Sequence, residues 1–489
     1  MNMVHFDCDL SESTGPLSHF WEHTVGSGHA TLALRADWQA QLKRCHDELG
    51  FGHVRFHGLL SDDMGTLVDE QDKMRYAFFN ADQIMDFLLS IGMNPFVELS
   101  FMPTALASGP KTVFKYRANV TPPADYAKWS KLITKLMKHW GERYGMDAVR
   151  KWFFEVWNEP NLNAFWTADQ SEYFKLYRHT VSAIKEVDDR FRVGGPATAK
   201  NEWVSDFVDF CDTNKLPADF VSTHHYPTDA LGSAGEDTLA QLAHSRRSIL
   251  RQWAQDSHRN ARGRPLYYTE WNASSNPRDE LHDEPYTAAF IVKTMMEARG
   301  LVHGYSFWTF TDIFEENYFP AKAFQGGFGL LTVQNIAKPS YRAFELLHHL
   351  GTETCLVDGL HETVDAWVVR DPQSATALFT NTALPRHPLE TETVEIQLRG
   401  ASAPDEVYVQ RIDYDHANAR RHWREMGEPP TPNPREVEQL QAASELKREP
   451  VSWSFENGTI DLKLTLPPHS VAAVVVKMAS RRDEGSATS

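Results

Sequence analysis

The sequence has little cysteine, no CxxC pair and no long apolar run. Its four cysteines, Cys8, Cys45, Cys211 and Cys355, are scattered through 489 residues. A zinc site or a dense disulfide framework needs cysteines at short, repeated spacings, so the sequence predicts neither. We expect these side chains to be buried, reduced thiols of the kind found in cytosolic proteins.

The sequence shows neither a membrane-spanning segment nor a secretory signal. No apolar run approaches the roughly 20 residues that a membrane-spanning helix needs. The first ten residues carry neither the basic nor the apolar part of a secretory signal, so we expect a cytoplasmic protein. A net charge of −17 would repel phosphate backbones and anionic lipid, which argues against nucleic-acid and membrane partners.

What the chain does have is a regular alternation of short β-rich segments and longer amphipathic ones, from about residue 18 to 345. This pattern is typical of βα units, and eight of them predict an α/β fold, the (β/α)8 TIM barrel. A doubly wound sheet is the alternative, but no GxGxxG follows the first strand. The expected strands are Phe20–Gly26, Gly52–Phe56, Pro95–Ser100, Trp152–Trp157, Arg192–Pro196, Phe220–His224, Leu266–Glu270 and Gly304–Phe310.

After about residue 346 the helical rhythm stops and short alternating segments follow, which predicts a C-terminal β-sandwich accessory domain. We place the barrel at residues 15–345 and the sandwich at 346–480, with residues 1–14 adding a strand to it. Residues 481–489 are expected to form a disordered tail. The polar segment Asp413–Glu449 reads as an excursion from the sandwich, without a chemical motif.

Two carboxylates stand out, because active sites of such barrels lie at the C-terminal ends of the strands. Glu159 follows Trp157 at the end of the fourth expected strand, and Glu270 ends the seventh. A carboxyl group beside an indole is poorly solvated as an anion, so the pKa of Glu159 should rise, as a general acid requires. A pair about 5–5.5 Å apart would act as acid/base (Glu159) and nucleophile (Glu270) of a retaining glycosidase.

Other polar side chains end neighbouring strands in pairs. Arg55 and His57 lie two residues apart, as do His224 and Tyr226, so each pair should share a face. Arg55 could stabilise the carboxylate of Glu270, or it could belong to a buried structural ion pair. By the same alternation, Glu155, Trp157 and Glu159 should share one face. Asn158 should lie on the opposite face unless the strand end bends, and His225 should point away from His224 and Tyr226.

Longer strings carry a family resemblance. The motif around Glu159 and the position of Glu270 resemble the clan A glycoside hydrolases, and further strings resemble family 39 over about residues 10–350. These strings are Arg55–Leu60, Phe101–Pro103, Thr121–Pro123, His282–Tyr286, Phe307–Thr309, Phe314–Glu316 and Gly326–Leu331. The family contains bacterial β-xylosidases and animal α-L-iduronidases, and the chain is more similar to the former.

The resemblance implies a retaining exo-β-1,4-xylosidase that releases xylose from xylo-oligosaccharides through a covalent glycosyl-enzyme, without metal or organic cofactor. A homo-oligomer is also common in the family. Asn158 would donate to the sugar 2-hydroxyl and Tyr226 would steady the nucleophile. The other implied sugar-binding residues are His57, Phe114, His224, Trp308, Glu315 and Glu316; Trp308 could instead be barrel core. The stretch Ala273–Pro277 departs from the family pattern because it lacks aromatic character.

Alternatives remain open at this level. An α-L-iduronidase would need Arg or Lys in the pocket for the substrate carboxylate, which Glu315 and Glu316 would repel. An arabinosidase, or a catalytically silent carbohydrate-binding protein on the same scaffold, is compatible with the motifs. A phosphate-binding barrel would need a Gly-rich loop directly after the last strand, and a proton-abstracting enzyme a Lys or His base; neither can be placed.

Overall fold

The structure, a computed structural model, describes residues 3–70, 73–229 and 237–479. By contacts the chain divides into two compact units. One comprises Phe20–Asp279 and Gly300–Asn335, and the other Met1–His19, Glu280–Arg299 and Ile336–Ser489. The expected domain boundaries at 14/15 and 345/346 stay a prediction, and the expected tail, 481–489, lies outside the described residues. Within the described ranges, no helix is long and apolar enough to cross a membrane.

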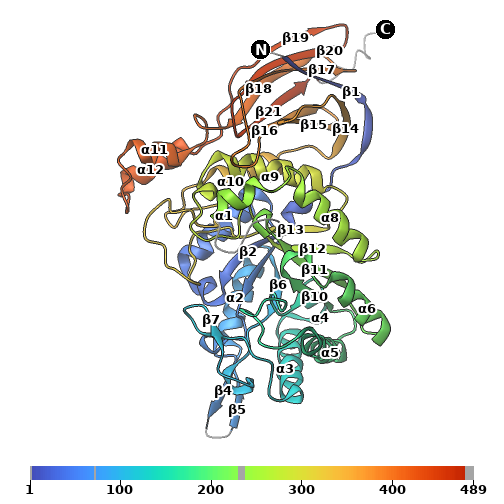
Figure 1. Ribbon diagram of the computed structural model, residues 1–489, viewed down its shortest axis with the longest axis vertical. Coiled ribbons are helices and arrows are strands. Elements are labelled where there is room, and N and C mark those ends of the chain that lie inside the picture. The colour runs from blue at the N-terminus through green and yellow to red at the C-terminus, as the bar shows by residue number, and fades with distance from the viewer. Residues whose placement is uncertain (1–2, 71–72, 230–236, 480–489) are drawn as a thin grey trace, which may run out of the picture. The chain divides into compact units, whose positions relative to one another are not determined.

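Eight parallel strands close into a barrel in the first unit, in the order β10-β11-β12-β13-β2-β3-β6-β9 (Figure 1). Their bounds are β2 Thr24–His29, β3 His53–His57, β6 Asn94–Leu99, β9 Phe153–Val156, β10 Arg192–Thr198, β11 Phe220–His225, β12 Leu266–Trp271 and β13 Gly304–Phe307. The (β/α)8 barrel predicted from the sequence is confirmed. The first strand begins later than expected, because Phe20–Glu22 forms a 3-10 turn.

Helices separate these strands along the chain. They are α1 Ala36–Leu49, α2 Phe79–Ser90, α3 Tyr126–Tyr144, α4 Met146–Val149, α5 Gln170–Val187, α6 Val204–Asn214, α7 Thr238–Ala243, α8 Ile249–Asn260 and α9 Pro285–Ala298. Helix α9 lies between β12 and β13 along the chain, although the division by contacts assigns it to the second unit. Asp125 and Asp169 cap the N-termini of α3 and α5, where their side chains accept hydrogen bonds from first-turn N–H groups. Two small hairpins, β4 Leu67–Glu70 with β5 Lys73–Tyr76 and β7 Thr112–Val113 with β8 Ala118–Asn119, lie in the loops.

Aromatic side chains fill the end of the barrel at which the strands begin. Phe96, Phe153, Phe220 and Tyr267, one from each of four strands, form a buried cluster, and the rings of Phe96 and Phe153 stack with centroids 5.0 Å apart. Because side chains on a strand alternate, the residues two positions further on also point inward. These positions carry Glu98, Glu155, Ser222 and Thr269, so a polar layer lies above the aromatic one.

The second unit contains a nine-stranded sheet in the order β18-β21-β16-β15-β14-β1-β17-β20-β19. Strand β1 pairs antiparallel with β14 and parallel with β17. Residues from both halves of the sheet share one buried core, in which Phe6 and Phe379 lie with ring centroids 6.4 Å apart. The sheet therefore folds over on itself, as expected of the predicted β-sandwich.

The bounds of these strands are β1 Met3–Pro16, β14 Glu353–Asp358, β15 Val364–Asp371, β16 Ser374–Asn381, β17 Glu392–Arg399, β18 Pro404–Ile412, β19 Ser452–Glu456, β20 Thr459–Leu466 and β21 Ser470–Met478. Four helices belong to the same unit: α9 Pro285–Ala298, α10 Pro339–His348, α11 Ala419–Glu425 and α12 Pro434–Ala443. Helices α11 and α12 lie in the expected excursion.

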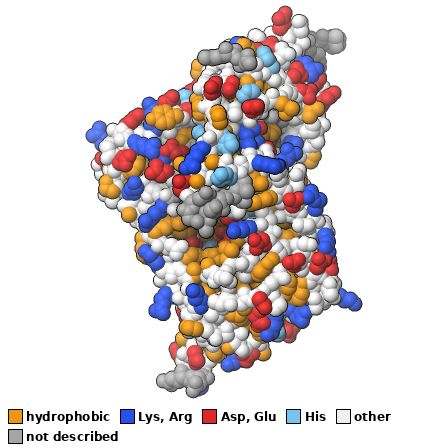
Figure 2. Space-filling view, viewed as in Figure 1, with side chains coloured by type: hydrophobic (Ala, Val, Ile, Leu, Met, Phe, Trp, Pro, Cys, Tyr) orange, Lys and Arg blue, Asp and Glu red, His pale blue; other side chains and the backbone are white. Residues whose placement is uncertain are grey.

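The surface carries charges of both signs. Figure 2 shows basic and acidic side chains interspersed over the visible face, without an extended basic field. Nucleic-acid-binding surfaces gather Lys and Arg on one face or stripe. The visible face therefore has no such feature.

A buried ion pair in the second unit gives a stability prediction. Lys338 Nζ lies 2.7 Å from Asp283 Oδ1, and neither side chain is exposed. Replacing Lys338 with Met should lower the free energy of unfolding by about 3–5 kcal/mol, because it removes a cation from a buried carboxylate. The matched control is Lys463→Met, whose partner Glu395 is partly exposed and whose loss should cost at most about 1 kcal/mol. Equal losses in urea unfolding would contradict the prediction.

Candidate active site

A cavity of ≈ 260 Å³ lies among the segments that follow the barrel strands. Most of the residues expected at the site line it: His57, Phe114, Asn158, Glu159, Tyr226, Glu270, Trp308 and Glu316. Arg55, His224 and Glu315 do not. The cavity wall also contains residues that the sequence did not single out, among them Lys200, Asp229 and Tyr318.

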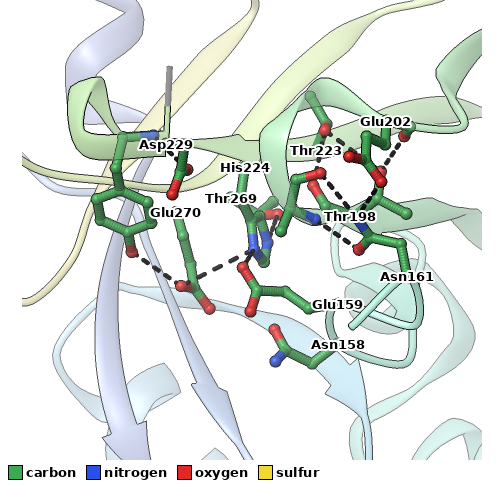
Figure 3. Close-up of polar contacts among 12 residues, drawn as sticks. Asn158, Glu159, Asn161, Thr198, Glu202, Thr223, His224, Asp229, Thr269 and Glu270 are labelled. Carbon is green, nitrogen blue, oxygen red and sulfur yellow. Dashed lines mark hydrogen bonds and ion pairs between the residues drawn. The ribbon is translucent and has the colours of Figure 1, made fainter. Parts of the chain in front are cut away.

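Glu159 and Glu270 face each other across this cavity. One oxygen of each carboxyl group and a nitrogen of His224 lie within 4.8 Å of one another. Figure 3 shows the two carboxyl groups pointing toward each other from opposite sides. Their side chains are 11% and 7% exposed, so both groups reach the cavity while most of each side chain is buried.

The backbone around Glu159 departs from the strand pattern. Strand β9 ends at Val156, and Trp157 and Glu159 have φ values of 73° and 43°. Such left-handed conformations are costly for residues with a side chain and concentrate at functional sites. The strand end therefore bends, which was the alternative to strict alternation, and the turned backbone brings both Asn158 and Glu159 to the cavity. Trp157 instead points away and its indole N–H donates to the Phe165 carbonyl at 2.9 Å.

Burial raises the pKa of Glu159 to about 7, although the positive charges of His57 and Arg55 oppose this shift. A carboxyl group with this pKa holds its proton up to near neutral pH. This is the property expected of a general acid.

His224 is buried next to the two carboxyl groups, and its hydrogen bonds indicate where the proton between it and Glu159 lies. Its Nδ1 lies 3.0 Å from Glu159 Oε1 and its Nε2 3.0 Å from Thr269 Oγ1. The Thr269 hydroxyl donates to Glu155 at 2.7 Å, so it must accept from His224 Nε2–H. Burial lowers the pKa of His224 to about 4, so the ring is neutral and its Nδ1 carries no proton. The hydrogen bond to Glu159 is then donated by the protonated carboxyl group.

His224 is not among the residues that line the cavity, so its expected contact with the sugar stays a prediction. Both ring nitrogens are used within the protein, and the side chain is fully buried. It positions Glu159 and does not line the cavity.

Arg55 is fully buried and connects Glu270 to the barrel interior. Its Nη1 donates to Glu270 Oε1 at 2.8 Å, its Nε to Glu155 at 2.6 Å and its Nη2 to Asn158 Oδ1 at 2.9 Å. Nη2 also lies 2.9 Å from Glu98. The alternatives of nucleophile partner and structural ion pair therefore both apply to Arg55.

His57 contacts the other end of the site. Its Nδ1 lies 2.7 Å from Glu98, and its Nε2 lies 3.5 Å from Glu270 and 3.6 Å from Glu316. Burial opposes the positive charge, but the adjacent Glu98 outweighs it and raises the pKa of His57 to about 9. The sequence analysis did not identify Glu98. A carboxylate inside the apolar run Phe96–Leu99 was the available signal, since such burial requires a partner.

The side chains of Glu315 and Glu316 point in different directions, and only that of Glu316 lines the cavity. Glu316 is 7% exposed and lines it, whereas Glu315 lies outside the lining and pairs with Arg35 at 3.0 Å. Burial raises the pKa of Glu316 to about 8, against the opposing charge of His57. The expected sugar contact by Glu315 is therefore not supported by this arrangement.

Tyr226 donates its hydroxyl hydrogen to Glu270 Oε2 at 3.0 Å, so both oxygens of Glu270 accept a hydrogen bond. Behind it, Thr228 Oγ1 lies 2.8 Å from Ser275 Oγ and joins the loops after β11 and β12. Ser275 belongs to the stretch that departs from the family pattern and lines the cavity. Asn276 is not part of the lining; its amide donates to Thr238.

Aromatic rings form the remaining wall. The Trp308 ring lies 4.7 Å from the His57 ring, centroid to centroid, and Phe114 lies 6.2 Å from the same ring on another side. His225 points the other way, stacking on Tyr268 at 3.8 Å. The cavity thus offers an apolar face next to hydrogen-bonding groups, which suits the C–H face and hydroxyls of a sugar.

A metal ion has one candidate group of ligands among the described residues, Glu159, His224 and Glu270. Arg55 and Tyr226 already occupy both oxygens of Glu270, and His224 is held by Thr269 and Glu159. The expectation of no metal or organic cofactor stays a prediction.

Known proteins resemble this chain over almost its full length. The family model described as "Glycosyl hydrolases family 39" matches residues 4–460. A β-xylosidase of Caldicellulosiruptor saccharolyticus is 49% identical, covering 95% of this chain and 96% of that protein, and one of Geobacillus stearothermophilus is 37% identical, covering 95% and 94%. The crystal structure of a monomeric β-xylosidase from Caulobacter crescentus CB15 matches with a TM-score of 0.87 and 33% identity, covering 98% of this chain and all of that one. The chain belongs to glycosyl hydrolase family 39.

Proposed function

We propose that this protein is a retaining exo-β-1,4-xylosidase that releases xylose from the non-reducing end of xylo-oligosaccharides. The observation that carries the proposal is the facing pair Glu159 and Glu270, with oxygens within 4.8 Å across a small cavity. Retaining glycosidases have carboxyl groups about 5–5.5 Å apart, and inverting ones leave room for a water between them. The names of the similar β-xylosidases support the choice of sugar.

In the first step, Glu270 attacks the anomeric carbon and the glycosidic bond breaks. The protonated Glu159 gives its proton to the leaving oxygen, so the leaving sugar departs as a neutral alcohol. Arg55 and Tyr226 hold Glu270 for this attack through hydrogen bonds to its two oxygens. Asn158, beside Glu159, is placed by Arg55 to bind the sugar 2-hydroxyl.

In the second step, water attacks the glycosyl-enzyme ester. Glu159, now a carboxylate, takes a proton from that water, and the bond between Glu270 and the sugar breaks. The neutral ring of His224 has an acceptor nitrogen toward Glu159, so it holds the returned proton in place. The cycle then starts again from the same protonation state.

The small volume of the cavity and the burial of its inner end support exo action. Its ≈ 260 Å³ is below the ≈ 300–1,000 Å³ of usual ligand pockets, which suits one sugar unit and not a chain passing through. Glu316 Oε1 is buried and has no hydrogen-bond partner among the described residues. A hydroxyl at the non-reducing end of the sugar would supply that partner.

Discrimination from an α-L-iduronidase does not rest on repulsion by Glu315 and Glu316. Glu315 lies outside the cavity, and the raised pKa of Glu316 leaves that carboxyl group largely neutral at pH 7. The case for xylose rests on the similar β-xylosidases, so the substrate has to be tested directly.

The first test compares wild type and Glu159→Ala on an aryl β-D-xyloside with a good leaving group, with and without azide. Wild type should be active, and the variant should lose about 10²–10⁴-fold in rate through loss of acid/base catalysis. Azide should restore part of it and give β-xylosyl azide, because a small anion can attack the glycosyl-enzyme without a base. Glu48→Ala, on the exposed face of α1, is the control.

Other results separate the alternatives. If wild type cleaves a different aryl glycoside and ignores the xyloside, the mechanism holds and the substrate is wrong. If it cleaves none but binds xylose, the protein is a silent carbohydrate-binding protein.

A second prediction concerns pH. Because Glu159 must be protonated and burial raises its pKa to about 7, kcat/KM for xylobiose should fall as the pH rises through about 7. In Thr269→Val, His224 loses the partner that fixes its proton on Nε2, so Nδ1–H can form and donate to ionised Glu159. The alkaline limb should then move to lower pH.

The control is Thr180→Val, which removes another buried hydroxyl that binds Trp129 and the Leu176 carbonyl. It should leave the pH profile in place. An unchanged limb in Thr269→Val would contradict the assigned proton positions.

A further inference from the structure

The cavity has a buried end and an open end. Trp308, His57 and Glu316 at one end are 3%, 2% and 7% exposed. At the other end Lys200 is exposed and Asp229 is half-buried, and both line the same cavity as Glu159. A sugar cleaved from a chain end enters the closed part, so the leaving sugar has to extend toward the open part.

Glu159, the proposed acid/base, also indicates that the leaving sugar lies toward the open end of the cavity. Glu159 must reach the leaving oxygen, so the leaving sugar lies on the Glu159 side of the cavity. Glu159 comes from β9, Lys200 follows β10 and Asp229 follows β11, and these three strands are neighbours in the barrel. Burial and then the charge of Glu159 raise the pKa of Asp229 to about 7, against the opposing charge of Lys200, so the three groups lie close enough to interact electrostatically.

Asp229 is held by the residue that contacts the nucleophile. The backbone N–H of Tyr226 donates to Asp229 Oδ2 at 3.1 Å, and the backbone N–H of Asp229 donates to the Tyr226 carbonyl at 3.0 Å. Figure 3 shows the Asp229 carboxyl group on the same side as Glu270 and clear of the network around His224. It is therefore fixed in place with an oxygen available to the cavity.

Lys200 is held by the loop that carries Glu159. It lies in a turn with φ of 62°, and Asn161 clamps that turn by donating to the Ala199 carbonyl at 3.0 Å and accepting from its N–H at 2.9 Å. Asn161 also donates to Glu202 at 3.0 Å. The position of Lys200 is thus coupled to Glu159, two residues before Asn161.

We propose that Asp229 and Lys200 form the subsite for the leaving sugar, where the carboxylate accepts and the ammonium donates hydrogen bonds to its hydroxyls. A hydroxyl group both donates and accepts, so this pair matches a sugar and offers nothing to a flat apolar leaving group. The inference rests on the proposed xylosidase activity and adds to it the recognition of the second sugar.

The test compares two substrates that share the xylosyl group. Xylobiose places a sugar in the proposed subsite, whereas an aryl β-D-xyloside with a good leaving group does not. Asp229→Ala should lower kcat/KM for xylobiose by about tenfold to hundredfold, the usual effect of losing a hydrogen bond to a charged group, and leave the aryl substrate within about threefold. Lys200→Ala should shift the ratio in the same direction by about threefold to tenfold, because Lys200 is more exposed.

Two further variants guard against structural effects. Asp229→Asn keeps a hydrogen-bonding side chain and should recover part of the xylobiose activity. Asp209→Asn on α6 removes an exposed carboxylate that pairs with Arg262 and should change neither substrate. An unchanged ratio in Asp229→Ala, or an equal fall on both substrates, would overturn the subsite. A wild type inactive on both xylosides would overturn the proposed function itself.

Discussion

Arg55 lies fully buried in the barrel, and its guanidinium group contacts side chains from three other strands. It binds Glu98 on β6, Glu155 on β9 and Glu270 on β12, all within 2.9 Å, as well as Asn158. A planar guanidinium presents its donors in a rigid fork, so these partners are fixed relative to one another. Glu270, the proposed nucleophile, and Asn158, beside the proposed acid/base, therefore take their positions from one cation, whose removal would leave several buried carboxylates uncompensated.

His57 and Arg55 together give chemically identical carboxyl groups different pKa values. Burial would raise the pKa of Glu98, but direct contact with His57 and Arg55 lowers it. Glu159 and Glu316 lack such close contact with Arg55, and burial raises their pKa values to about 7 and about 8. Environments that separate the pKa values of neighbouring carboxyl groups assign the acid and the base of a reaction.

The regular part of this arrangement could be predicted from the sequence, because period-two alternation and apolar strands set the barrel and the ends where Glu159 and Glu270 lie. The directions of side chains could not be predicted from the sequence where the backbone leaves that regularity. The left-handed turn at Trp157 reverses the side of Asn158, and the loop after β13 sends Glu315 outward. The role of His224 depended on Thr269, a partner 45 residues away that only the closed barrel brings near.

The polar layer next to the aromatic cluster could in principle have been predicted from the sequence. Glu98, Glu155 and Thr269 each follow a buried aromatic by two positions on a strand, which places them inside the barrel. The positions of Lys200 and Asp229 could not be predicted in this way, because turns outside the strands set them.

The contrast between the two ends of the cavity fits the two steps of a retaining mechanism. The glycone stays bound through both steps, so buried groups such as Glu316 can hold it without exchange with solvent. The leaving sugar must depart and water must take its place before the ester is hydrolysed. A half-buried carboxyl group and an exposed ammonium suit that exchange, because water replaces a sugar hydroxyl on either at little cost, whereas an apolar wall would stay dry. In the proposed subsite, the groups that recognise the second sugar are thus also those that admit the second reactant.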